Sequence, residues 1–171
     1  MEKSITFKEL SQRWLSVSSL GKTYTYQQNL QSYINHLNNG IGECKVSDVK
    51  PAHIDEIIRQ LYIENPNTKK PTSKKVLKNI VDCATRIFDY AIENELIYKN
   101  PARNKKKVIP KNAPTKIVGA ITPEQQQLVI DTEHRAKIAA VIMMFMGLRT
   151  GEVLALEWGD IDLVNYKLSV N

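Results

Sequence analysis

The chain has 171 residues, enough for one domain or for a small domain followed by part of another. With 42% hydrophobic and 25% charged residues it has the composition of a soluble globular protein, and its longest apolar run, residues 138–146, is too short to span a bilayer. The start of the sequence has no apolar signal-peptide core, so we expect a cytoplasmic protein.

The net charge of +6 is unevenly distributed. Residues 1–115 hold 19 basic and 11 acidic side chains, a balance of +8, whereas residues 116–171 hold 5 and 7, a balance of −2. A basic front joined to a slightly acidic rear indicates that the front meets a polyanion, although a well-solvated basic surface is an equally simple interpretation.

Apolar spacing predicts four helices before residue 101. A capping box over residues 6–9 begins the first, and Asn38-Asn39-Gly40 ends the second. Pro51 opens the third. The fourth and longest is expected from about residue 73 to 96, and Asn100-Pro101 closes it. Helices joined by short loops favour an orthogonal all-α bundle.

The composition then changes twice. Residues 102–117 are basic, contain two prolines and have few large apolar side chains, which predicts a basic interdomain linker. A second domain is expected from residue 118, with a capping box at residues 122–125. Residues 138–146 are typical of a fully buried helix, a further helix is expected over 152–158, and alternation over 162–170 predicts the first strand or hairpin of a sheet.

Residues 146–162 read MGLRTGEVLALEWGDID. This segment resembles the first-arginine motif of tyrosine recombinases (phage-type integrases), T-G-L-R-x-x-E-L-L-x-L-x-W-x-D-I-D, with Met146 in place of the first threonine. The resemblance implies a mainly α fold: a four-helix SAM-like core-binding domain over residues 1–101, the linker, and the N-terminal part of an α+β catalytic domain over residues 118–171.

The same resemblance implies site-specific DNA recombination through a tyrosyl–DNA intermediate. The implied partners are double-stranded DNA attachment sites and other recombinase protomers, with no membrane, metal, nucleotide or other cofactor. Arg149 is then the first catalytic arginine, since its planar fork can bind two phosphate oxygens, and Glu152 is its support. Otherwise the two form an ordinary ion pair at a helix start.

The family's remaining catalytic groups are a lysine, a His-x-x-Arg pair, a histidine or tryptophan and a tyrosine nucleophile, and none can be assigned before Asn171. We therefore expect this chain to bind DNA without cleaving it. Tyr166 falls on the predicted hairpin, so it is interpreted as a strand residue. The two alternatives are a non-catalytic helical DNA-binding or regulatory protein of the same fold, and a helical protein–protein adaptor.

Core-binding domains of this family place the starts of their second and fourth helices against DNA. By that resemblance the DNA-contacting residues are Lys22, Thr23, Tyr24 and Tyr26 at the second helix, Thr72, Ser73, Lys74, Lys75, Lys78 and Arg86 on the fourth, and Lys105, Lys106 and Lys107 in the linker. Each of them is alternatively a solvated surface residue. The three histidines and two cysteines lack metal-ligand spacing, and no glycine-rich phosphate loop occurs, so neither a metal nor a nucleotide is expected.

Overall fold

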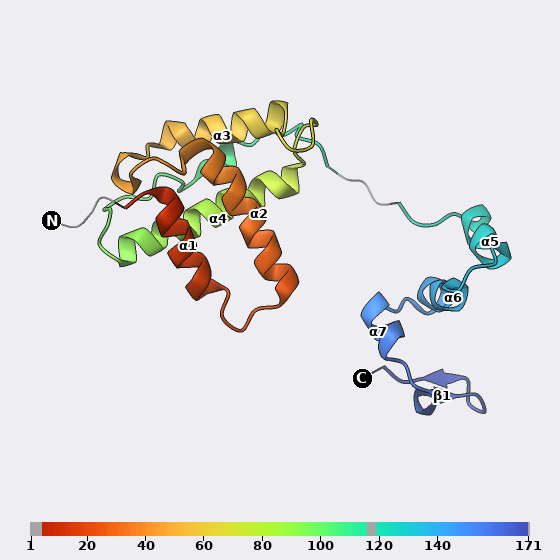
Figure 1. The fold of residues 1–171 in the computed structure, drawn as a ribbon. Coiled ribbons are helices and arrows are strands. Elements are labelled where there is room, and N and C mark those ends of the chain that lie inside the picture. Colours follow the sequence, from red (N-terminus) through yellow and green to blue (C-terminus); the bar gives the residue numbers. More distant parts are fainter. Residues whose placement is uncertain (1–4, 116–118, 171) are drawn as a thin grey trace. The chain divides into compact units, whose positions relative to one another are not determined.

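In the computed structural model, residues 5–115 and 119–170 are described, and the chain divides into two compact units between residues 116 and 117. The first unit contains α1 (Phe7–Ser18), α2 (Tyr24–Ile41), the 3-10 turn η1 (Val46–Asp48), α3 (Pro51–Ile63), α4 (Lys74–Glu93) and the 3-10 turn η2 (Lys105–Val108). The helix α4 packs against α1, α2 and α3, and the four helices form a bundle (Figure 1). The predicted all-α architecture of this region is confirmed.

The first unit has a closed apolar core. Phe7 of α1 and Phe88 of α4 lie at its centre, with ring centroids 5.3 Å apart. Every buried apolar side chain in the described residues belongs to this core, which runs from Phe7 to Ala113. The helix α4 contributes most to it because its buried positions recur at three- and four-residue steps along its length.

The end of α2 differs from the prediction. The helix α2 continues through Asn38-Asn39-Gly40 to Ile41 instead of ending there. Gly40 lies inside the helix, where a Cβ atom would stand 2.6 Å from Cγ1 of Ile57 on α3. The glycine at this position therefore permits a close approach of two helices, which the sequence pattern does not distinguish from helix termination.

The basic segment after α4 belongs to the first unit as far as residue 115. Ala102, Ile109 and Ala113 are buried there, and η2 packs against α3 and α4. The carbonyl of Pro114 accepts a 2.8 Å hydrogen bond from the backbone N–H of Lys74. We call residues 102–115 the strap. Its composition predicts a linker because its buried side chains are mostly small and widely spaced, a weak signal beside so many lysines.

The second unit contains α5 (Pro123–Asp131), α6 (Lys137–Met146), α7 (Thr150–Ala155), the 3-10 turn η3 (Trp158–Asp160) and the antiparallel pair β1 (Ile161–Asp162) and β2 (Lys167–Leu168). The predicted hairpin is present, but Tyr166, which was expected on a strand, lies in the turn before β2 with φ of 53°. The helix expected over 152–158 is shorter and begins earlier. None of residues 119–170 is buried. The prediction that residues 138–146 form a fully buried helix is therefore wrong for this structure: Ile138 is 75% and Phe145 61% exposed, and α5 and α7, which pack against α6, leave residues 139–144 only half-buried.

No helix among the described residues combines the length and the apolar character that crossing a membrane requires.

Candidate nucleic-acid interface

Arg149 stands at the junction of α6 and α7. Gly147 ends α6 in the left-handed conformation, with φ of 69°, and Arg149 is extended and caps α7. Its backbone N–H donates to Oε2 of Glu152 at 2.7 Å, and its Nη1 donates to Oε1 at 2.8 Å. The Glu152 carboxylate thus accepts hydrogen bonds from both the backbone N–H and the guanidinium of Arg149. The sequence motif placed these two residues one helical turn apart, and the structure brings them together.

Glu152 positions Arg149 and leaves most of its guanidinium donors free. The backbone N–H of Arg149, followed by its side chain, lowers the pKa of Glu152, which favours the ionised carboxylate that accepts these hydrogen bonds. The Arg149 side chain is 87% exposed, whereas that of Glu152 is 28% exposed. Glu152 uses one of the five guanidinium N–H groups, so four others remain, and two of them can bind two oxygens of a phosphate.

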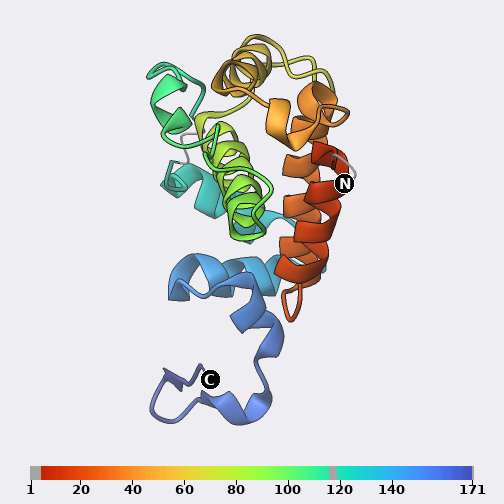
Figure 2. The same ribbon diagram turned by 90° about the vertical axis from the view of Figure 1, so that its left-hand side faces the viewer.

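A polar row follows one side of α4 in the first unit. The row consists of Lys75, Lys78, Asn79, Asp82 and Arg86. Each of them lies three or four residues from another member, which puts all five on one helical face, and all are exposed or half-buried. The neighbouring helix α2 packs against α4: it crosses α4 in the view of Figure 1 and lies next to it in Figure 2. Only three members of this row were predicted from the sequence, since Asn79 and Asp82 are not basic.

Two tyrosines of α2 hold members of the row. Arg86 donates from Nη1 to the hydroxyl of Tyr26 at 3.3 Å, and Asn79 donates from Nδ2 to the hydroxyl of Tyr33 at 2.9 Å. These side chains line a shallow hollow of about 240 Å³ between the two helices. Tyr33 was missed in the sequence analysis. Its helical spacing places it beside the core and gives no sign of the hydroxyl's partner.

The buried thiol in the wall of this hollow is not a reactive group. Cys83 is 2% exposed, and burial raises its pKa to about 12. A thiol in that state is neither a nucleophile nor a metal ligand at neutral pH. Among the described residues, no group of three or more His, Cys, Asp or Glu side chains lies close enough together to hold a metal ion.

The strap lysines differ from one another in the structure. Nζ of Lys105 lies 2.6 Å from Oδ2 of Asp55 on α3, and this lysine side chain is only 16% exposed. Lys106 pairs instead with Asp82 of the polar row, and its side chain is half-exposed. Lys107 is exposed and forms no ion pair within the described ranges. Of the three predicted phosphate contacts in this segment, Lys105 is therefore occupied inside the protein.

The start of α4 is less open than the sequence analysis expected. Thr72 is 6% exposed, and its hydroxyl accepts a hydrogen bond from the Asn65 amide at 3.1 Å. The Ser73 hydroxyl accepts from the backbone N–H of Val76, and Pro114 takes that of Lys74. The Lys74 ammonium donates to the carbonyl of Lys111 at 3.0 Å. Because the N-terminus of α4 is already capped by its own chain, Thr72 and Ser73 lie outside the proposed interface.

The start of α2 is more accessible. The Thr23 hydroxyl accepts a hydrogen bond from the backbone N–H of Tyr26 and so serves as the helix cap. Lys22 is exposed, and Tyr24 is 75% exposed. These residues present a cation and an aromatic ring to solvent beside the tyrosine that holds Arg86.

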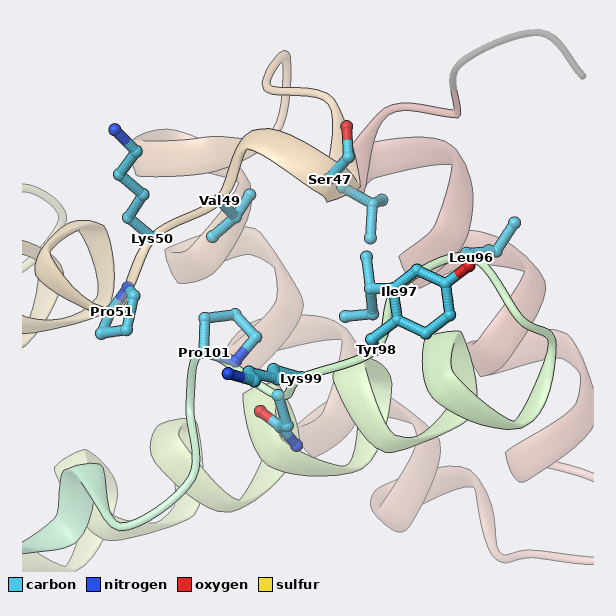
Figure 3. Close-up of a pocket in the computed structure, with 11 residues that line it drawn as sticks. Ser47, Val49, Lys50, Pro51, Leu96, Ile97, Tyr98, Lys99 and Pro101 are labelled. Carbon is cyan, nitrogen blue, oxygen red and sulfur yellow. The ribbon is translucent and has the colours of Figure 1, made fainter.

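A larger hollow of about 640 Å³ lies elsewhere on the first unit (Figure 3). Its walls come from residues 46–51 and 96–101, and most of the side chains that line it are apolar. Lys50, Lys99 and Tyr98 are its ionisable residues, with no carboxylate, histidine or cysteine among them. This combination offers no acid–base pair and no nucleophile.

Residues 7–108 match the protein family described as "Phage integrase central domain". The chain belongs to the phage integrase family of tyrosine recombinases. The resemblance that the arginine motif indicated is thereby confirmed, on residues outside that motif. The two signals are independent of each other, because the matched region ends well before residue 146.

Among curated proteins, the chain is 28% identical to a tyrosine recombinase XerC-like protein of Caldanaerobacter subterraneus, over 98% of this chain and 44% of that protein. It is 25% identical to the ICEBs1 integrase of Bacillus subtilis, over 99% of this chain and 45% of that protein. The chain spans less than half the length of these relatives.

Among solved structures, the Tn1549 transposon integrase (residues 82–397) in complex with circular intermediate DNA is similar, with a TM-score of 0.77 and 21% identity over 95% of this chain and 52% of that one. A lambda integrase dimer bound to a core site gives a TM-score of 0.71 and 19% identity, over 94% of this chain and 44% of that one. These likenesses establish the fold, and the predicted fold class is confirmed.

Proposed function

We propose that this chain is the DNA-gripping part of a site-specific tyrosine recombinase. In this proposal the first unit is the core-binding domain, residues 119–170 begin the catalytic domain, and Arg149 is the first catalytic arginine. The full protein exchanges DNA strands through a tyrosyl–DNA intermediate, with further protomers on the attachment sites, and acts in the cytoplasm. Residues 1–171 by themselves bind DNA without cleaving it.

The observation that carries the proposal is the exposed guanidinium of Arg149, held by Glu152 inside the family's arginine motif. Phosphoryl transfer needs cations fixed where negative charge grows on the phosphate oxygens, and an arginine with several free N–H groups meets that need. The exposed apolar side chains of α6 agree with the relatives' greater length: in the whole protein, the rest of the catalytic domain covers them.

The DNA-binding surface is proposed to be the α2–α4 face together with the exposed lysines of the strap. We define this face by its exposed or half-buried cations and tyrosines: Lys22, Tyr24, Tyr26, Lys75, Lys78, Arg86, Lys106 and Lys107. Lysine and arginine contacts to phosphates supply affinity that depends strongly on salt and little on sequence.

A salt series tests this surface. Binding to a random-sequence duplex is measured by fluorescence anisotropy for the wild-type chain and for a Lys75→Glu, Lys78→Glu variant. If each lysine neutralises one phosphate, the slope of log K against log salt becomes shallower by about two. Lys45→Glu with Lys50→Glu is the matched control, because both lysines are exposed and lie at η1 and the start of α3. Equal slopes in the two variants would contradict the assignment.

The role of Arg149 is tested in the full-length protein with a suicide substrate that traps covalent complex. Arg149→Lys keeps the charge but loses the planar fork, so trapping should fall to background while DNA affinity stays within about twofold. Trapping at the wild-type rate would remove Arg149 from the mechanism.

A further inference from the structure

The polar row on α4 carries a mixture of side chains that phosphate binding does not explain. Between the cations Lys78 and Arg86 stand an amide, Asn79, and a carboxylate, Asp82. A carboxylate repels phosphate and weakens a surface whose only task is to hold the DNA backbone. Asn79, Asp82 and Arg86 are, however, the side-chain types that pair with base edges in the major groove, with adenine, cytosine and guanine respectively.

We propose that Asn79, Asp82 and Arg86 read base edges, and that Asp82 determines specificity by accepting a hydrogen bond from the amino group of a cytosine. This inference rests on the proposed DNA-binding function and adds the residues that select sequence. From residue 79 to residue 86 the helix rises about 10 Å, which is about three base-pair steps. One helix face therefore carries three readers over a length of about four neighbouring base pairs.

The hydrogen bonds already present leave Asn79 and Arg86 free to contact a base. Asn79 gives one amide hydrogen to the Tyr33 hydroxyl and keeps its other amide hydrogen and its carbonyl oxygen, the two groups that adenine requires. Arg86 uses Nη1 for the Tyr26 hydroxyl and keeps its remaining N–H groups for guanine. The tyrosines of α2 thus limit the rotamers of two readers before DNA arrives, which lowers the entropy lost on binding.

Asp82 is held from the other side. It pairs with Lys106 of the strap, and no ion pair joins it to Arg86 within the described part of the chain, although the two are four residues apart on one helix. An ordinary solvated helix face satisfies its charges by such local pairs. Here a lysine from another segment neutralises the carboxylate, and so offsets the repulsion between Asp82 and the DNA phosphates.

The test is selection of bound duplexes from a library with a randomised central stretch, followed by sequencing of the pools. The wild-type chain should enrich a short motif that contains a C·G pair. Asp82→Asn should change the preference at that pair by about tenfold or more and leave the other positions as they were, while Arg86→Lys should relax a different position. Asp48→Asn is the control, since Asp48 is exposed, lies on η1 and undergoes the same change of charge.

The outcomes separate this inference from the proposed function. If the wild-type chain binds no duplex even at low salt, both the inference and the proposed function fail. If it binds with a steep salt dependence but enriches no motif, or if the Asp82→Asn pool keeps the wild-type motif, the base-reading row is wrong and the DNA-binding function stands. Far-UV circular dichroism of each variant confirms that its helices are retained, so that a lost motif reports on reading and not on folding.

Discussion

In the first unit α4 buries apolar side chains along its whole length, whereas in the second unit α6 leaves an even more apolar surface open to solvent. Both helices are well formed, so the contrast lies in tertiary packing and not in local propensity. Helices of ten residues are marginal in water without a packed face. The first unit therefore has what an independently stable domain needs, and residues 119–170 lack the cover that would stabilise theirs.

In the second unit, local hydrogen bonds stabilise the helix starts and the turn, where the first unit has a closed apolar core. Capping boxes begin α5, α7 and η3, and the Asp162 carboxylate accepts the backbone N–H groups of Val164 and Asn165 in the turn between the strands. The Arg149–Glu152 arrangement is one of these boxes. The candidate catalytic arginine is thus positioned by its own neighbours in sequence, before any core forms around it.

Hydrogen exchange in the whole chain gives the largest expected contrast. Backbone amides in the middle of α4 should exchange about a thousandfold more slowly than those of α6, because the former open only when the core unfolds. Peptide-level mass spectrometry after pulsed deuteration at neutral pH measures both helices in one sample. Equal protection would mean that α6 is covered in solution, for example by another copy of the chain. The contrast between a packed α4 and an open α6 would then be wrong.

Removing one aromatic ring from each unit sharpens the contrast between the packed first unit and the open second unit. Phe88→Ala should lower the free energy of unfolding by about 3–5 kcal/mol, since it empties the centre of the core. Phe145→Ala, at an exposed position of α6, should change it by less than about 0.5 kcal/mol. Urea unfolding is followed by the fluorescence of the buried Trp14, in a Trp158→Phe background that removes the exposed indole. A comparable loss from Phe145→Ala would contradict the difference.

The sequence sufficed for the helices and core of the first unit because apolar residues recur there at helical spacing and caps stand at most helix starts. It failed where a residue's role depends on a distant partner. Gly40 sits against Ile57, and the η2 turn of the strap packs on α3 and α4. Neither contact leaves a local pattern, so one was interpreted as a helix end and the other as a linker.

The candidate site divides in the same way. Arg149 and Glu152 were predictable because their interaction spans three residues of a known motif. Tyr33, Asn79 and Asp82 were not, since the row that they form depends on α2 and the strap lying on either side of α4. The expectation that the start of α4 is open to DNA also fails for Thr72, because its hydroxyl accepts a hydrogen bond from the Asn65 amide.

The ion pair that ties the strap to α3 should have a moderate effect. Lys105→Ala leaves the Asp55 carboxylate without its cation while Oδ1 of the same group is already buried without a hydrogen bond among the described residues. We expect a loss of about 1–3 kcal/mol in the free energy of unfolding. Lys107→Ala, which removes an exposed lysine two residues away, is the control. Identical unfolding curves for the two variants would show that the strap is not part of the cooperative unit.

The smallest effect comes from the same motif placed in both units. Thr6 and Thr122 each accept a hydrogen bond from a backbone N–H three residues on, in complete capping boxes. Thr6→Ala should cost about 1 kcal/mol of global stability, because α1 unfolds only with the core. Thr122→Ala should lower the helicity of residues 123–131, seen in Cα chemical shifts, and leave the urea midpoint unchanged. A shifted midpoint would mean that α5 unfolds with the bundle, and the two units would then be one cooperative structure.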